Sequence, residues 1–167
     1  MGIVASSILP PNFGYFAGGF DGSVVLSSID KLNFNTDINS SSGKNLTSQI
    51  IALSGMANSG TAGYFGGGQD SKLNNLSSVE KLAFSTESVT SLKKVLSETR
   101  INHAGMANSG TAGYFAGTGG AGVTSSSIDK IAFSNDTSSL LAATLSTTAY
   151  QLAGMANSGT AGYFGGG

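Results

Sequence analysis

The sequence lacks cysteine and tryptophan altogether and contains a single histidine among its 167 residues. Without cysteine there is no disulfide, no thiolate nucleophile and no sulfur ligand for a metal ion. One histidine cannot supply the imidazole cluster that commonly holds zinc. These absences exclude thiol enzymes and disfavour metalloenzymes, and we expect neither a metal site nor a cofactor.

Charge is also scarce, because only 10% of the residues are charged and 8 Lys and Arg stand against 9 Asp and Glu. Proteins that attract nucleic acid or anionic membranes carry an excess of basic side chains. No apolar run reaches the ~18 residues of a membrane span, and the first residues lack the basic start of a secretory signal. We therefore expect a soluble protein that contacts neither nucleic acid nor membrane.

What the chain has in excess is glycine, with 25 residues, alongside a hydrophobic fraction of 40%. Disordered chains combine low hydrophobicity with high charge, and this composition has neither property. The length suits one domain. The sequence therefore predicts a folded domain in which many backbone positions need a residue without a side chain.

Two sequence elements recur along the chain. The first, Gly-Met-Ala-Asn-Ser-Gly-Thr-Ala-Gly-Tyr-Phe, opens residues 55–68, 105–117 and 154–167, and a degenerate copy covers residues 12–19. The second, Ser-Ser-(Ile/Val)-(Asp/Glu)-Lys-(Leu/Ile)-x-Phe, covers residues 27–34, 77–84 and 126–133. Successive tyrosines of the first element are 49, 50 and 49 residues apart: Tyr15, Tyr64, Tyr114 and Tyr163. A period near 50 is typical of propeller blades rather than of helical or leucine-rich repeats.

Each repeat is predicted to consist of strands. The first element forms a hairpin because its Asn-Ser-Gly supplies the conformations that a tight turn needs. The second element is a third strand of about eight residues. A fourth strand is expected at residues 46–53, 88–96 and 140–145. Residues 140–145 also suit a short helix on propensity, but Thr, Ile and Val in the sister segments favour a strand. Glycine would let crowded inner strands approach one another.

The paired glycines after Tyr-Phe, followed by the serine-rich second element, resemble the kelch family of β-propellers. The resemblance covers residues 12–167 and implies an all-β fold of propeller blades, although the tryptophan usual in a kelch blade is missing. The first element is also similar to repeats in structural proteins of marine bacteriophages, particularly those that infect cyanobacteria. This second resemblance implies a role in the virion.

The repeats divide the chain into blade units at residues 12–53, 54–103 and 104–152 and a final half-blade at 153–167. Residues 1–11 are expected to form an N-terminal strand or an anchoring arm. The chain thus holds about three and a half blades, whereas complete propellers have four to eight. An open sheet edge exposes unpaired backbone groups. We expect a homo-oligomer in which two chains close one ring; the alternative is a head-to-tail array.

Few residues suggest chemistry. His103 occupies the position that Leu53 and Leu152 fill in the sister repeats, which favours a structural role. The acid and lysine of the second element are adjacent, so they point to opposite faces of a strand. The acid is then expected to face a neighbouring blade's backbone or a lysine. The acid–lysine pairs are Asp30-Lys31, Glu80-Lys81 and Asp129-Lys130.

Recognition is expected in the loops at residues 20–26, 69–76 and 118–125, which differ most between the repeats. One carboxylate per loop falls short of the six to eight oxygens that calcium prefers. The candidate recognition residues are therefore given no metal ligand role. They are Asp21, Gly22, Asp70, Ser71, Gly119 and Gly120.

The resemblances together predict a non-enzymatic structural and binding protein of a phage virion, assembled in the host cytoplasm. It would decorate the capsid or form part of a tail appendage, with other virion proteins or a host-surface glycan or protein as partners. The alternative is a cellular β-propeller module that binds proteins or glycans. Copper-radical oxidases of the kelch family need a cysteine, which is absent, and no acidic pair suggests glycoside hydrolysis.

Overall fold

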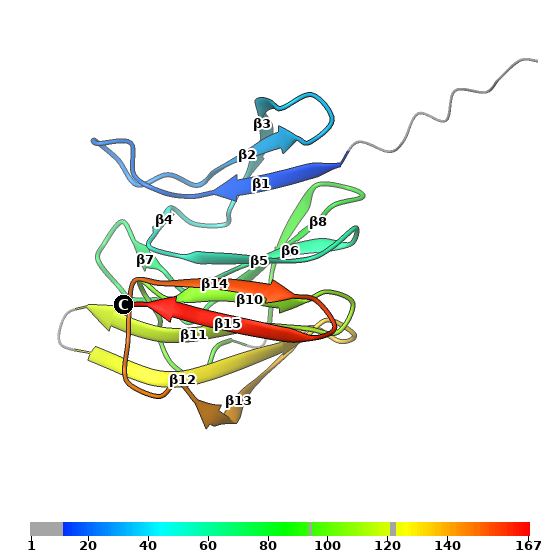
Figure 1. Cartoon of the computed structure of the whole chain (residues 1–167). Helices are drawn as coiled ribbons and strands as arrows, with labels where there is room; N and C mark the ends of the chain where they lie inside the picture. The colour runs from blue at the N-terminus through cyan, green and yellow to red at the C-terminus, as the bar shows by residue number, and fades with distance from the viewer. Residues whose placement is uncertain (1–11, 94, 121–122) are drawn as a thin grey trace, which may run out of the picture.

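The computed structural model describes residues 12–93, 95–120 and 123–167, and these ranges form β-strands, turns and loops (Figure 1). The predicted all-β class is confirmed for them. No helix in these ranges is long and apolar enough to cross a membrane. The expected N-terminal strand or arm at residues 1–11 lies outside the described residues.

The strands form small antiparallel sheets in which neighbours in the sequence pair with each other. The first sheet contains β1 (Phe13–Ala17), β2 (Ser28–Asn33) and β3 (Ile38–Asn45). The second sheet contains β5 (Ser54–Asn58), β6 (Ala62–Gly66), β8 (Val79–Ala83) and β9 (Ser88–Ser91). The third sheet contains β10 (Ala104–Asn108), β11 (Ala112–Gly120), β12 (Val123–Ala132) and β13 (Thr137–Thr144). The C-terminal hairpin contains β14 (Leu152–Asn157) and β15 (Ala161–Gly166).

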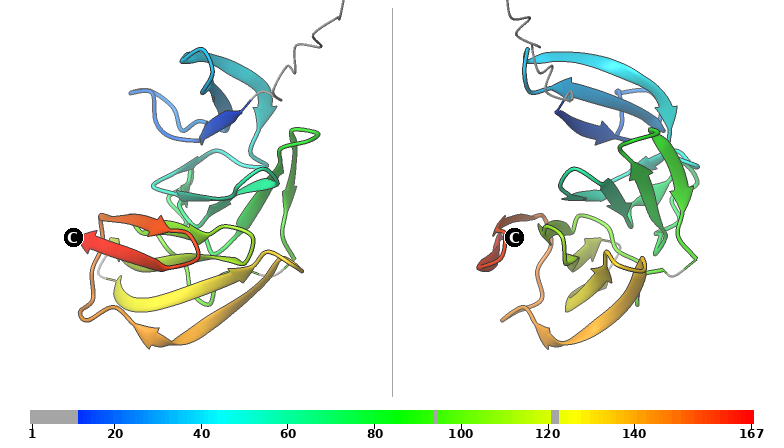
Figure 2. Two further views of the ribbon diagram at one scale, coloured as in Figure 1. Left: turned by 45° about the vertical axis from the view of Figure 1, so that its right-hand side comes forward. Right: turned by 90° about the vertical axis from the view of Figure 1, so that its right-hand side faces the viewer.

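A short pair, β4 (Ile50–Ile51) with β7 (Gln69–Asp70), links the first and second sheets. The sheets follow one another along a curved line in chain order (Figure 2). Apolar side chains fill the two spaces between them. The cluster between the first and second sheets contains Ile29, Leu46, Ile50, Phe65 and Leu82. The cluster between the second and third contains Met56, Tyr64, Val79, Leu96, Phe115, Ile131 and Phe133.

The third strands are present in the three sheets, and the predicted hairpins are present as β5–β6, β10–β11 and β14–β15, whereas residues 12–19 contain the single strand β1. The register repeats between sheets. Tyr15 lies opposite Lys31, Tyr64 opposite Lys81, and Tyr114 opposite Lys130. Each turn uses its glycine in the left-handed region, as at Gly60 with φ of 73°. The repeated sequence therefore specifies a repeated pairing as well as repeated strands.

The fourth strand is only partly where the sequence placed it. Residues 140–144 lie in β13, and β9 covers the start of the segment 88–96. The prediction of an outer strand at 46–53 is wrong, because only β4 forms there and it pairs with β7 rather than with the first sheet. The first sheet instead ends with β3, an exposed polar strand. Residues 46–53 lead from the first sheet to the second: Leu46 and Ile50 donate backbone hydrogen bonds to Ser27 and Leu26 just before β2, and β4 pairs with β7. The buried apolar side chains of this segment, such as Leu46 and Ile50, gave it the apolar pattern expected of a strand. The actual outer strand, β3, is polar and faces solvent.

Glycine allows the inner strands of successive sheets to approach closely. A Cβ atom added to Gly105 would lie 2.7 Å from the carbonyl oxygen of Gly55, and one added to Gly154 would lie 2.5 Å from that of Gly105. Real side chains do not tolerate such contacts with backbone. The expectation that glycine permits close packing of β5, β10 and β14 is confirmed.

We predict that Gly105→Ala lowers the free energy of unfolding by about 1–3 kcal/mol, because the added methyl group forces the inner strands apart. Urea denaturation followed by circular dichroism measures this change. Gly165→Ala is the matched control, since a Cβ there meets no atom within 4 Å. It should change stability by less than about 0.5 kcal/mol. Equal effects of the two substitutions would contradict the close approach.

Candidate functional site

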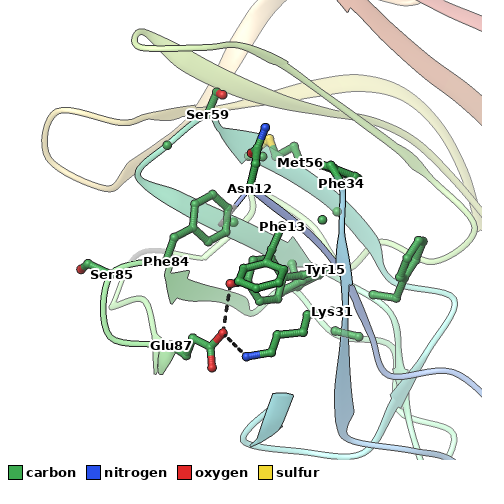
Figure 3. A pocket seen from close by; sticks show the side chains of 18 of the residues that line it. Asn12, Phe13, Tyr15, Lys31, Phe34, Met56, Ser59, Phe84, Ser85 and Glu87 are labelled. Atoms are coloured by element: carbon green, nitrogen blue, oxygen red, sulfur yellow. Dashed lines mark hydrogen bonds and ion pairs between the residues drawn. The ribbon is translucent and has the colours of Figure 1, made fainter. Parts of the chain in front are cut away.

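Neighbouring sheets are joined by a tyrosine and a lysine of one sheet that bind a carboxylate of the next. The Tyr15 hydroxyl and the Lys31 ammonium donate to Glu87 Oε1 at 3.2 and 2.8 Å (Figure 3). The following pair of sheets repeats the arrangement. There Tyr64 and Lys81 donate to Asp136 at 2.7 Å each. We call this arrangement the inter-sheet triad.

The tyrosine ring of each triad also stacks on a phenylalanine of the next sheet. Tyr15 and Phe84 have ring centroids 5.1 Å apart with planes 10° from parallel, and Tyr64 and Phe133 are 5.0 Å and 19° apart. Stacked aromatic pairs contribute beyond their buried area. The stack and the hydrogen bond act on one side chain, so they fix both the separation and the rotation of adjacent sheets.

The triad carboxylate comes from the turn after the third strand. Glu87 and Asp136 have positive φ, 49° and 55°, and so does Asp37 at the same place in the first sheet, with 55°. Sequence analysis missed these residues. A sequence pattern could have indicated them, because in every repeat a second acidic residue follows the acid of the second element by seven residues. The pairs are Asp30 and Asp37, Glu80 and Glu87, and Asp129 and Asp136.

The strand acids make a second contact between sheets, on the face opposite to the lysine. Glu80 accepts from the Thr47 backbone N–H at 2.8 Å and its hydroxyl at 2.7 Å. Asp129 accepts from the Ser97 backbone N–H at 3.1 Å and its hydroxyl at 3.0 Å. This agrees with the prediction that the acid faces the backbone of a neighbouring repeat.

Arg100 adds a buried ion pair to the Asp129 contact, which sequence analysis did not predict. Its Nε and Nη2 atoms donate to Asp129 Oδ2 at 3.0 and 2.8 Å, and Nη1 donates to the Gly117 carbonyl at 2.7 Å. Both side chains are fully buried. The sister positions hold Ile50 and Ala149, so the repeat pattern gave no sign of this pair.

A groove of about 1400 Å³ lies between the first and second sheets, along β1 and β5 (Figure 3). Its lining is mainly aromatic and aliphatic and includes Phe13, Phe34, Met56 and Phe84. The triad of Tyr15, Lys31 and Glu87 forms one end of this lining. The groove can therefore accept apolar groups beside one satisfied ion pair.

The ionisable groups of the groove are poorly suited to proton transfer. Burial and the negative charge of Glu87 raise the pKa of Tyr15 to about 12. The hydrogen bond from Lys31 lowers the pKa of the Glu87 carboxyl. A general acid or base needs a pKa near the working pH. At neutral pH the tyrosine stays protonated and the glutamate stays ionised, so the arrangement holds sheets together rather than moving protons.

The candidate recognition loops at residues 20–26 and 69–76 lie at the same end of the successive sheets (Figure 1). The loop expected at residues 118–125 is wrong where the structure describes it, because residues 118–120 belong to β11 and residues 123–125 to β12, and they pair with each other.

Within each of the first two loops the carboxylate binds its own backbone. Asp21 accepts from Ser23 and Val24 at 2.8 and 2.9 Å, and Asp70 accepts from Lys72 and Asn74, both at 2.9 Å. These hydrogen bonds lower the pKa of both carboxyls, with the side-chain amide of Asn74 contributing most at Asp70.

The other candidate residues contribute through their backbone conformation or a backbone hydrogen bond. Gly22 and Gly120 have positive φ of 97° and 145°, and Ser71 lies in the turn that follows β7. The Gly119 carbonyl accepts from the Asn102 amide at 3.1 Å. The first two loops are each closed by hydrogen bonds to their own carboxylate.

No three acidic or histidine side chains in the described ranges lie close enough together to hold a metal ion. No protein-family model matches this chain, and no curated protein matches it in sequence.

His103 is buried between the second and third sheets and meets Phe115 edge-on, with ring centroids 5.4 Å apart. Neither ring nitrogen makes a hydrogen bond of normal geometry with the described residues. Burial and the positive charge of Arg100 lower its pKa to about 3. The side chain is therefore neutral at physiological pH and packs as an apolar group, as its leucine counterparts do.

We predict that His103 makes the fold sensitive to mild acid. In the unfolded chain the imidazole binds a proton below its usual pKa of 6.5, whereas in the folded protein it stays neutral down to about pH 3. Stability is therefore lost as the pH falls, by about 1.4 kcal/mol between pH 7.5 and 5.5. Urea denaturation at both values measures the loss. The His103→Leu variant, which copies the sister repeats, should lack this loss; an identical loss would contradict the assignment.

Proposed function

We propose that this chain is a non-enzymatic structural and binding protein of a bacteriophage particle, in which it decorates the capsid or forms part of a tail appendage. In this proposal the sheets are kelch-like propeller blades that assemble with other virion chains. The resemblance of the repeats to kelch blades and to structural repeats of marine phages supports it. The candidate site also supports it, because its ionisable groups bind one another: the pKa of Tyr15 is raised and the pKa of Glu87 is lowered.

The observation that carries the proposal is that one sequence occupies both buried and exposed surroundings. Residues 55–68 and 154–167 are identical. Tyr64 is 1% exposed and Tyr163 is 61% exposed, and Met56 and Met155 are 8% and 68% exposed. The buried copy is covered by the third sheet, against which Met56 and Tyr64 pack. The exposed copy thus carries a packing surface whose complement is a further sheet.

The first sheet presents the complementary half of such a contact. Phe34 is 53% exposed and Asp37 is exposed, although their counterparts in the second sheet are bound by Tyr15. In a second copy placed end to end, Tyr163 would stack on Phe34 and donate to Asp37. Met155 would meet Gly14, as Met56 meets Gly113 within the chain. Two chains joined at both ends in this way would form the proposed ring.

We predict that the purified chain has twice the 16.7 kDa mass of a single chain in solution. Size-exclusion chromatography with light scattering measures it. Tyr163→Ser should return the mass to that of one chain, because it removes the stack and the hydrogen bond to the second copy. Leu140→Ser is the matched control, since it removes a similarly exposed apolar side chain from the outer strand β13. A single-chain mass for the unmodified protein would overturn the two-chain ring.

The virion role is tested by incubating the purified chain with purified cyanophage capsids and measuring co-sedimentation. Saturable binding in a fixed ratio to the shell protein supports capsid decoration. Binding to host-surface glycans without hydrolysis, with no binding to capsids, supports the tail appendage. Binding to neither the phage particle nor the host surface would contradict a virion role.

A further inference from the structure

The outer edge of β15 is a strand edge without a partner among the described residues. β15 pairs with β14 on one side only. Its twin β6 pairs with β5 on one side and with β8 on the other. Since residues 55–68 and 154–167 are identical, the two edges have the same side chains and the same backbone groups. An unpaired edge of this kind is a template for another strand.

The register of the missing strand follows from the second sheet. There the Gly67 N–H donates to Ser78 O at 2.9 Å, and the Phe84 N–H donates to Thr61 O at 3.0 Å. The equivalent groups of the C-terminal hairpin are the Gly166 N–H and the Thr160 carbonyl. In a strand that pairs in the same way, the residue equivalent to Lys81 lies opposite Tyr163, as Lys81 lies opposite Tyr64.

Three side chains of the third sheet and its following loop are also without their usual partners. Tyr114 and Lys130 correspond to Tyr64 and Lys81, but within the described ranges they make neither a side-chain hydrogen bond nor an ion pair. Ser146 corresponds to Ser97, which binds Asp129. Ser146 is exposed, and no described carboxylate accepts from it.

These groups lie where the two earlier sheets bind their outer hairpins. The hairpin β8–β9 is held by the edge of β6 and, from the sheet before it, by Tyr15, Lys31 and Thr47. The hairpin β12–β13 is held by the edge of β11 and by Tyr64, Lys81 and Ser97. The edge of β15, together with Tyr114, Lys130 and Ser146, provides the same groups a third time: a strand edge, and a tyrosine, a lysine and a hydroxyl residue from the sheet before it. We call this set the hairpin acceptor.

We propose that the hairpin acceptor binds an extended β-hairpin supplied by another protein chain. The bound hairpin carries a carboxylate in its first strand for Ser146, a phenylalanine four residues later for the face of Tyr114, and a second carboxylate three residues after the phenylalanine for Tyr114 and Lys130. This spacing is that of Glu80, Phe84 and Glu87. The inference rests on the proposed function, because assembly of the particle would bring the partner chain to this surface.

Charge complementarity selects this partner. The acceptor offers an ammonium, a phenolic hydroxyl and a serine hydroxyl, all hydrogen-bond donors, whereas the hairpin offers two carboxylates. A second copy of this chain is a poor source, because its equivalent strands β2, β8 and β12 already pair with β1, β6 and β11 along the edge that β15 would occupy. A strand with a basic residue in place of either acid would leave two like charges or two donors facing each other.

The test is binding of a synthetic peptide of residues 77–91 to the intact chain, measured by isothermal titration calorimetry. We expect saturable one-to-one binding and no binding of a scrambled peptide. The peptide variant Glu87→Gln and the protein variant Lys130→Met should each weaken binding about fivefold. Combining them should weaken it no further than either alone, because both remove the same ion pair.

Lys72→Met is the matched protein control, since Lys72 is an exposed lysine of the turn after β7 whose side chain makes no hydrogen bond or ion pair with the described residues. It should leave the affinity for the peptide unchanged. Absence of peptide binding to folded protein, or equal affinity for the Lys130→Met variant, would overturn the inference. The proposed end-to-end assembly is measured separately by the mass in solution, so either proposal can fail alone.

Discussion

The fold depends on one interaction, the tyrosine that reaches from the first sheet to the second and again from the second sheet to the third. Its ring stacks on a phenylalanine and its hydroxyl donates to a carboxylate that a lysine also binds. Apolar side chains fill the spaces between these sheets, and the directional contacts of the tyrosine set the distance and the angle between them. Glycine then becomes an advantage, because the inner strands can close to backbone contact.

This arrangement makes stability a property of neighbouring sheets rather than of single repeats. An isolated two-stranded hairpin is marginally stable in water. The second sheet is covered on both sides and contains the most completely buried tyrosine of the repeat, whereas the C-terminal hairpin has the same sequence and remains exposed. Repeat proteins gain stability from interfaces between units in the same manner. Both proposals above follow from surfaces that this logic leaves uncovered.

Much of the fold could be predicted from the sequence because the repeats make the pattern visible several times. The hairpins, the third strands, the glycine contacts and the direction of Glu80 and Asp129 toward a neighbouring repeat all follow from local rules. The inter-sheet triad was missed because its carboxylate, Glu87 or Asp136, comes from the adjacent sheet. Arg100 was missed because it occurs in one repeat only, and β3 because an exposed polar strand carries no apolar alternation.

The central claim is that the adjacent sheet, and not the local sequence, stabilises each hairpin. Amide hydrogen exchange at Tyr64 and Tyr163, measured by NMR on dilute single chains, tests it most directly, because each residue lies opposite the methionine of its own hairpin in the same register. The account predicts that the Tyr163 amide exchanges faster by roughly a hundredfold or more. Equal protection of the two amides would contradict it.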